Sequence, residues 1–158
     1  MVQPIRYRDG YKHQLAEPYE IELPELRPWV TRELEIAPWL WLRLVDDVPV
    51  LMIRQGYAWD GASGPTWDTQ SFHRGPCVHD ALYQLIRAEL LSPEARGAAD
   101  EIMLRLILED VEHRWEGALY GPVRATLRAR ARIWYRSVRV GASFAADPDA
   151  KRPVLVAP

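Results

Sequence analysis

The chain contains, near its middle, the stretch Cys77-Val78-His79-Asp80-Ala81-Leu82-Tyr83. We expect this stretch to lie in a helix that covers roughly 75–87. Residues at offsets of three, four and seven from His79 share its helical face, and all are apolar or aromatic: Leu82, Tyr83 and Ile86. Because this face is apolar, we expect it to point toward the interior and to take His79 with it. Asp80 lies about 100° further round the helix, near the edge of the buried stripe.

A second helix is predicted to begin at Ser92-Pro93-Glu94 and to run to about Glu112. Serine is a good N-cap, proline suits the first helical position, and glutamate favours the positive end of the helix. Asp100 falls on the core-facing stripe, with apolar residues at offsets of three, four, seven and eleven: Met103, Leu104, Ile107 and Val111. Burying an unpaired carboxylate costs several kcal/mol, so Asp100 is expected to have a partner.

The partner that we expect for Asp100 is His79. If the two helices form an antiparallel hairpin with its tip near residues 89 and 90, the two side chains are equidistant from the tip and lie level. Tyr83, one turn from His79, is placed to donate a hydrogen bond to Asp100 as well. An inward histidine beside an inward carboxylate fixes a tautomer and stabilises imidazolium in general-base catalysis. The alternative is a buried hydrogen bond that only fixes the register of the two helices.

The rest of the chain completes the expected fold. Four runs have the patterns of β-strands: Tyr19–Leu23, Leu34–Ile36, Trp39–Val45 and a run from Val50 to about Tyr57. A third helix is predicted over roughly Pro122 to Val140, before a proline-containing segment. Strands first and helices second argue for an α+β fold. We predict one domain over 1–140, with a small antiparallel sheet followed by three helices, the first two an antiparallel hairpin, and an irregular tail over 141–158.

Composition excludes several classes of protein. The 158 residues carry a net charge of -2 and are 48% hydrophobic and 27% charged, which excludes a wholly disordered chain. The single cysteine, Cys77, cannot form an internal disulfide, which excludes a small disulfide scaffold. No apolar run approaches the roughly 20 residues of a transmembrane segment, and the N-terminus lacks a signal-peptide pattern. We therefore expect a soluble protein made in the cytosol.

The segment between the strands and the helices resembles a loop that binds a hard cation. It reads Asp60-Gly61-Ala62-Ser63-Gly64-Pro65-Thr66-Trp67-Asp68, and glycine bends let such a loop present backbone carbonyls to an ion. Asp60, Gly61 and Asp80 are the candidate metal ligands, with calcium as the ion and Asp68 as an alternative carboxylate. Calcium there would polarise a carbonyl while His79 activates water. The simpler alternative is that the glycines only make a turn.

A zinc site is another alternative. It would draw on four side chains: His73, His79, Asp80 and Asp100. The sequence lacks the Cys-x-x-Cys and His-x-x-x-His pairs that are typical of zinc sites, so this hypothesis is the weaker one.

The predicted third helix carries a basic stripe. Its arginines recur every three or four residues: Arg124, Arg128, Arg132, Arg136 and Arg139. No acidic residue occurs between Ala118 and Ala146. Such a helix favours contact with phosphate, lipid headgroups or an acidic partner. The alternative is a solvated face that pairs with the acid-rich strand region.

Several of these motifs together resemble a family of small, uncharacterised phage and prophage proteins. The matching blocks are Gly56-Tyr57-Ala58-Trp59-Asp60-Gly61-Ala62-Ser63-Gly64-Pro65, His79-Asp80-Ala81-Leu82-Tyr83, Ala99-Asp100, and Tyr120 with Val123-Arg124. The resemblance covers roughly residues 10 to 140. It implies a phage setting, with synthesis in the host cytoplasm, association with the virion and other phage structural proteins as partners. It does not imply a reaction.

The same blocks also resemble the phospholipase A2 superfamily over about residues 56 to 104. That resemblance implies that His79 is the general base, that Asp100 orients it, and that Asp80 and Asp60 belong to a calcium site. The sequence departs from that superfamily at Ala62, where cysteine is usual, and in its β-rich first half. Two hypotheses follow. The chain is either a phage-encoded, calcium-assisted hydrolase of an ester in lipid or a cell-envelope polymer, or a non-catalytic virion structural or accessory protein.

Overall fold

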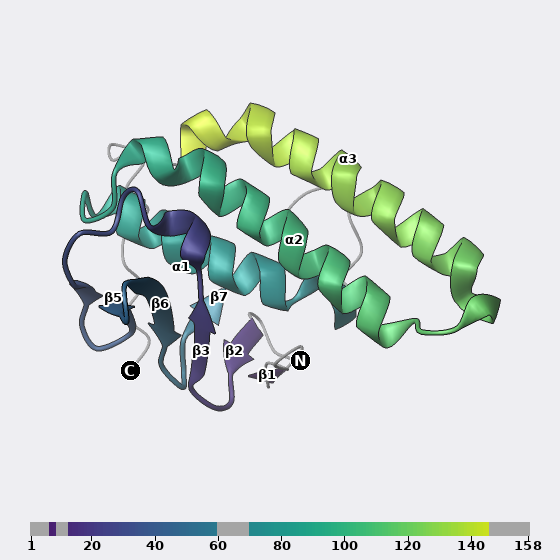
Figure 1. Ribbon diagram of the computed structural model, residues 1–158, viewed down its shortest axis with the longest axis horizontal. Coiled ribbons are helices and arrows are strands. Elements are labelled where there is room, and N and C mark those ends of the chain that lie inside the picture. Colours follow the sequence, from purple (N-terminus) through teal and green to yellow (C-terminus); the bar gives the residue numbers. More distant parts are fainter. Residues whose placement is uncertain (1–6, 9–12, 60–69, 146–158) are drawn as a thin grey trace.

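The structure, a computed structural model, describes residues 7–8, 13–59 and 70–145. Its strands all lie in the first 59 residues, and its three α-helices follow them (Figure 1). The α+β fold predicted from the sequence is therefore confirmed. The strands lie on one side of α1, and α2 separates α1 from α3 (Figure 1).

Two antiparallel sheets form the β part of the molecule. The larger has the strand order β3-β6-β5-β4, with bounds Tyr19–Glu22, Val48–Ile53, Leu40–Val45 and Leu34–Ile36. The smaller has the order β1-β2-β7, with bounds Tyr7–Arg8, His13–Leu15 and Ala58–Trp59. A tight turn joins β5 to β6, and its two residues, Asp46 and Asp47, both have positive φ angles (48° and 66°). Such angles are those of the two-residue turns that match the twist of a hairpin.

The predicted strand from Val50 to about Tyr57 is wrong in its extent. The strand begins earlier, at Val48, and ends at Ile53. The chain then bends at Gly56, whose φ is +91°, and a separate short strand begins at Ala58. Glycine adopts this φ without the strain that a side chain would add, so the chain can turn at Gly56 between the two strands.

Three α-helices make up the second half: α1 over Arg74–Arg87, α2 over Arg96–Arg114 and α3 over Gly121–Ala145. Single 3-10 turns lie at Pro24–Leu26, Gln70–Phe72, Pro93–Ala95 and Ala118–Tyr120. The predicted cap is present, since the Ser92 hydroxyl accepts a hydrogen bond of 3.2 Å from the backbone N–H of Glu94. Helix α3 continues past its predicted end, so residues 141–145 of the expected irregular tail are helical. The sequence has no proline between Pro122 and Pro148 that would interrupt the helix, and residues 146–158 lie outside the described part.

Helices α1 and α2 form the predicted antiparallel hairpin (Figure 1). Its tip turns at Ala88 and Glu89, close to the predicted residues 89 and 90, and Glu89 has a φ of 58°. Near the open end of the hairpin, the buried Arg74 forms 2.8 Å ion pairs with Glu109 and Asp110 of α2. These contacts fix the position of α1 along α2. They therefore determine which residues of the two helices face each other.

The interior consists of two apolar clusters. The larger joins the sheets to α1 and the first half of α2, with Leu40, Leu51 and Leu82 among its fully buried members. The smaller lies between α2 and α3 and includes Phe72 and Trp134. None of the helices within residues 70–145 combines the length and the apolar character that a membrane span requires.

Gly75 is the point where α1 approaches α2 most closely among the described glycines. A Cβ atom at this position would lie 2.8 Å from both the Ile107 side chain and the Met103 carbonyl oxygen. We expect Gly75→Ala to lower the free energy of unfolding by about 1–3 kcal/mol, because the helices must move apart. Urea unfolding would measure this. Gly121→Ala is the control, since nothing lies within 4 Å of its added Cβ. Equal unfolding midpoints for the two variants would contradict the close approach.

Candidate functional site

The centre of the candidate site is a contact between α1 and α2. The His79 Nε2 atom lies 2.9 Å from the Asp100 Oδ1 atom. Asp100 has no exposed surface, and His79 is 9% exposed. The predicted meeting of these two side chains in the interior is therefore confirmed.

Helical periodicity explains why the two residues face each other. Leu82, Tyr83 and Ile86, which share the His79 face, are all buried, so this face of α1 points inward as predicted. On α2, Met103, Ile107 and Val111 of the predicted stripe are buried, as is Ala99 beside Asp100. Leu104, predicted to share this stripe, is only half-buried and lines a surface hollow. An apolar stripe that contains a single carboxylate must bring that carboxylate to a donor, because burial without one is costly.

Two further groups complete the coordination of Asp100. The Tyr83 hydroxyl donates a 2.7 Å hydrogen bond to Oδ1, the same oxygen that His79 contacts. Arg139 Nη1 of α3 donates a 3.2 Å hydrogen bond to the other oxygen, Oδ2. The Tyr83 ring also lies against the His79 ring, with 4.1 Å between centroids. We call His79, Tyr83, Asp100 and Arg139 the Asp100 network.

Arg139 belongs to the basic stripe that the sequence predicts for anionic partners. In the structure its guanidinium instead binds Asp100. A signal for its position was nevertheless present: an ionised carboxylate has about four lone-pair sites, so a buried one needs more donors than one histidine and one tyrosine supply. That signal predicts a further donor without saying which arginine provides it.

Asp80 lies beside the other nitrogen of the imidazole. Its Oδ1 atom is 3.6 Å from His79 Nδ1, which is longer than a hydrogen bond. Its side chain is 36% exposed, compared with 11% for the His79 side chain. The imidazole therefore has a buried carboxylate at one nitrogen and a partly solvated carboxylate near the other.

These surroundings change the proton affinities of the network. Burial by itself lowers the pKa of His79, but the carboxylates of Asp100 and Asp80 outweigh it, so the pKa lies above its usual value of 6.5. Burial raises the pKa of Asp100, but hydrogen bonds from His79, Tyr83 and Arg139 outweigh that effect, and the net pKa is lowered. Burial, together with the neighbouring Asp100, raises the pKa of Tyr83. The imidazolium and the carboxylate thus stabilise each other.

The raised pKa of His79 predicts how stability depends on pH. Its contribution is complete below the unfolded-state pKa of 6.5 and is lost as the pH rises through the higher folded-state pKa. We therefore expect the free energy of unfolding to fall as the pH rises above about 6, and to fall less in His79→Gln. Urea titrations of both proteins at a series of pH values on either side of 6.5 would measure the difference. If the free energies of unfolding of the two proteins changed with pH in parallel, His79 would have the same pKa in the folded and unfolded chain.

The described residues supply only part of the predicted metal sites. Asp60 and Gly61 lie outside the described residues, as does Asp68, and Asp80 is the one predicted calcium ligand whose position is given. Among residues 13–59 and 70–145, no group of three or more His, Cys, Asp or Glu side chains is arranged to bind a metal ion. The zinc set is not assembled either. His73 lies against His13 of β2, with 4.6 Å between ring centroids. The described residues by themselves do not form a metal site.

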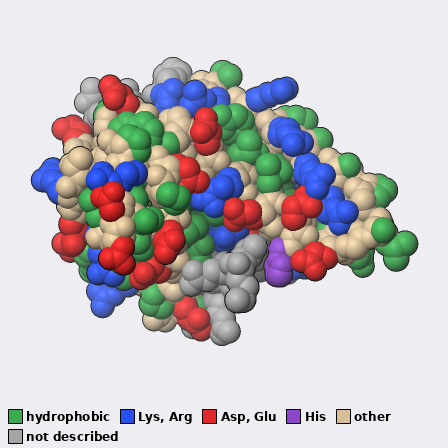
Figure 2. All heavy atoms as spheres, viewed as in Figure 1, with side chains coloured by type: hydrophobic (Ala, Val, Ile, Leu, Met, Phe, Trp, Pro, Cys, Tyr) green, Lys and Arg blue, Asp and Glu red, His purple; other side chains and the backbone are tan. Residues whose placement is uncertain are grey.

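Most arginines of the predicted stripe contact acidic side chains of this chain. Arg128 forms an ion pair with Glu112, and Arg124 lies 3.7 Å from the same carboxylate. Arg139 binds Asp100, as described above. The partners are thus on α2 and not in the strand region that we considered as the alternative. Arg132 and Arg136 remain exposed, and Figure 2 shows basic side chains along the edge of the molecule with acidic ones beside them.

The surface hollows described for residues 13–59 and 70–145 lie elsewhere. The larger, about 460 Å³, lies along α2 and is lined by Glu101, Leu104, Arg105, Leu108, Glu109 and Glu112. The smaller, about 210 Å³, lies on the larger sheet and is lined by Glu33, Trp41, Arg43 and Met52. Neither is lined by a residue of the Asp100 network.

The chain was also compared with known proteins. No family model, no curated protein and no solved structure matches it.

Proposed function

We propose that this chain is a phage- or prophage-encoded ester hydrolase with His79 as its general base. The observation that supports this most is the asymmetric setting of the imidazole. His79 Nε2 contacts the fully buried Asp100, while Nδ1 lies beside the partly exposed Asp80. A general base needs one nitrogen held by a carboxylate and the other directed toward the reacting proton.

The proposed reaction uses water as the nucleophile. His79 Nδ1 takes a proton from water as the water oxygen attacks the carbonyl carbon of the ester. Asp100 stabilises the imidazolium that forms, and Tyr83 and Arg139 hold Asp100 in place. The tetrahedral intermediate then collapses, the bond to the alcohol oxygen breaks, and the imidazolium returns its proton to that oxygen. The products are a carboxylic acid and an alcohol.

The substrate class in this proposal is an ester of a lipid or of a cell-envelope polymer. The exposed Arg132 and Arg136 would contact its anionic groups. In this proposal, calcium would be held by Asp60, Gly61 and Asp80 together. Of these three residues, the structure describes Asp80 alone.

A second candidate function is a non-catalytic virion protein, either structural or accessory. The observation that favours it is that the Asp100 network ties α1, α2 and α3 together at one point. A buried polar network that joins three helices fixes their relative positions, whatever else it does. In this case the chain would be made in the host cytoplasm and would bind other phage structural proteins.

An assay of the unaltered protein separates the two candidates. We would follow hydrolysis of p-nitrophenyl butyrate by absorbance and of phosphatidylglycerol vesicles by titration of released acid, each with calcium and with EDTA. The hydrolase proposal expects turnover that increases with pH as His79 loses its proton. The absence of turnover on both probes at every pH would reject it for these esters and favour the virion protein. A rate that EDTA leaves unchanged would reject the calcium part alone.

A further inference from the structure

The exposed large apolar side chains of the described residues fall into two groups. One group lies at the two ends of β5 and consists of Trp39 and Val45. The other lies on α3 and on the turn before it, where Ile133 is 64% exposed and Val140 is 83% exposed. Apolar side chains that gather on the surface of a folded protein are typical of contact surfaces.

The second group extends along the side of α3 that points away from α2. Trp134 on the inner side is buried, whereas Arg132, Arg136 and Val140 recur every four residues on the outer side and are exposed. Neither of these two arginines forms an ion pair with another described residue. The outer side therefore combines unpaired positive charge with apolar side chains. We call it the α3 face, and it consists of Arg132, Ile133, Arg136 and Val140.

The first group borders the outer side of the larger sheet. Alternate side chains of β5 and β6 belong to the core next to α1, so the side chains between them point away from it. The strand register places one row of residues on this outer side: Glu20, Met52, Trp41 and Glu35. The hollow of about 210 Å³ described above lies on the same side, which we call the sheet face.

The sheet face is apolar at its centre and acidic at its edges. Trp41 and Met52 lie on the two inner strands, and the glutamates lie on or next to the edge strands β3 and β4. Four of its glutamates are exposed and form no ion pair with a described residue: Glu20, Glu22, Glu33 and Glu35. Arg43 lies between them and offsets part of their charge.

The dimensions of the sheet face suit a helix. Neighbouring strands are about 4.8 Å apart, so the two edge strands of a four-stranded sheet are about 14 Å apart. An α-helix with its side chains has a diameter of about 10–12 Å. A helix that carries basic side chains can therefore lie over the apolar centre, with glutamates on both sides of it.

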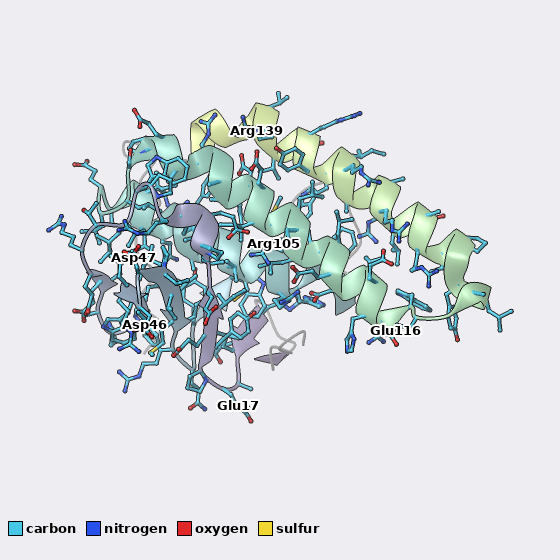
Figure 3. All side chains as sticks on the ribbon, viewed as in Figure 1. Glu17, Asp46, Asp47, Arg105, Glu116 and Arg139 are labelled. Atoms are coloured by element: carbon cyan, nitrogen blue, oxygen red, sulfur yellow. The ribbon has the colours of Figure 1, made fainter. Side chains whose placement is uncertain are left out.

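The α3 face and the sheet face lie on opposite sides of the molecule. Figure 1 shows α3 on one side, the strands on the other, and α1 and α2 between them. Figure 3 shows the same separation for single residues, since Glu17, Asp46 and Asp47 lie on the strand side and Arg139 lies on α3. The two faces of one molecule therefore cannot meet, although their charges are of opposite sign.

We infer that the α3 face of one copy of this chain binds the sheet face of a second copy. Arg132 and Arg136 pair with the edge glutamates, and Ile133 enters the hollow beside Trp41 and Met52. Tryptophan, methionine and arginine are residue types that are enriched at protein interfaces. Because the two surfaces differ, each copy keeps one face free, and association continues into a filament or a closed ring.

This inference does not rest on the hydrolase proposal, in which the same two arginines contact an anionic substrate. The first test uses the unaltered protein. Sedimentation velocity at low salt should show species heavier than one chain as the protein concentration rises, and added salt should reduce them by screening exposed charges. A protein that stays monomeric at every concentration would overturn the inference. If that monomer bound phosphatidylglycerol vesicles, the α3 face would serve a lipid surface instead.

Two variants test which faces meet. The α3 variant combines Arg132→Gln, Ile133→Gln and Arg136→Gln, and the sheet variant combines Glu20→Arg and Glu35→Arg. All five positions are exposed, so circular dichroism should show the wild-type fold. Each variant alone should associate with itself about tenfold more weakly, because two exposed ion pairs are lost.

The control for both variants is Arg114→Glu, which alters an exposed arginine at the end of α2, outside both faces. It should associate as the wild type does. If the sheet variant did not fold, Glu22→Arg with Glu33→Arg would replace it, since these are the other two glutamates of the sheet face. Undiminished association of a folded α3 variant or sheet variant would contradict the inference.

An equimolar mixture of the two variants is the sharpest test. The α3 variant keeps an intact sheet face, and the sheet variant keeps an intact α3 face. Exactly one of the two possible contacts between them is therefore preserved, and the mixture should form a 1:1 complex that grows no further. A mixture that contains only monomers would overturn the inference. Ester hydrolysis enters none of these measurements, so failure of the hydrolase proposal leaves their outcome unaffected.

Discussion

Asp100→Ala is expected to lower the free energy of unfolding by about 3–5 kcal/mol, the range seen when one partner of a buried charged network is removed. The change leaves the Tyr83 hydroxyl, the His79 Nε2 group and Arg139 without the carboxylate that they share. It also leaves a small cavity at a position that has no exposed surface. Urea unfolding followed by circular dichroism would measure the loss.

The matched control for this change is Glu101→Ala. Glu101 is the next residue on α2, and it is exposed. Its removal takes away the same charge and should change the free energy of unfolding by less than about 0.5 kcal/mol. If Asp100→Ala were no more destabilising than Glu101→Ala, Asp100 would not be the centre of a buried network.

The second large effect concerns activity. If the chain hydrolyses esters, His79→Gln is expected to lower the turnover rate by about 10²- to 10⁴-fold, the usual contribution of a general base. Glutamine keeps a polar group near Asp100 but cannot take up a proton in this pH range. Initial rates on the active probe, together with the circular dichroism spectrum, would show whether activity falls while the fold remains.

His113→Gln is the control for this second effect. The His113 side chain is 66% exposed and lies at the end of α2, so its replacement should leave the rate unchanged. A His79→Gln variant with wild-type turnover would remove His79 from the mechanism. If the unaltered protein has no activity, and His79→Gln is folded but less stable, the result supports the virion protein.

The contact between His79 and Asp100 was predictable because it depends only on local regularities. Helical periodicity placed each side chain on an apolar face, and a short hairpin brought the two faces level. The hairpin turns at Ala88 and Glu89, close to the predicted residues 89 and 90 and just before the cap at Ser92. Tyr83 was predictable for the same reason, since it lies one turn from His79.

Other contacts depend on distances along the chain that patterns do not encode. Arg139 is 39 residues from Asp100, and charge alone did not show which arginine of α3 turns toward α2. The strands β1, β2 and β7 have two or three residues each, too few to show an alternating pattern. The pairing of β2 with β7 therefore went unpredicted, as did the contact between His13 and His73.

The most direct test of this account is the protonation state of the His79 ring by ¹⁵N NMR. The geometry predicts that neutral His79 carries its proton on Nε2, because that atom must donate to Asp100 Oδ1 at 2.9 Å. Nδ1 should then be the atom that titrates, with a midpoint above the usual value of 6.5. A neutral ring protonated on Nδ1, or a midpoint that Asp100→Asn leaves unchanged, would contradict the account.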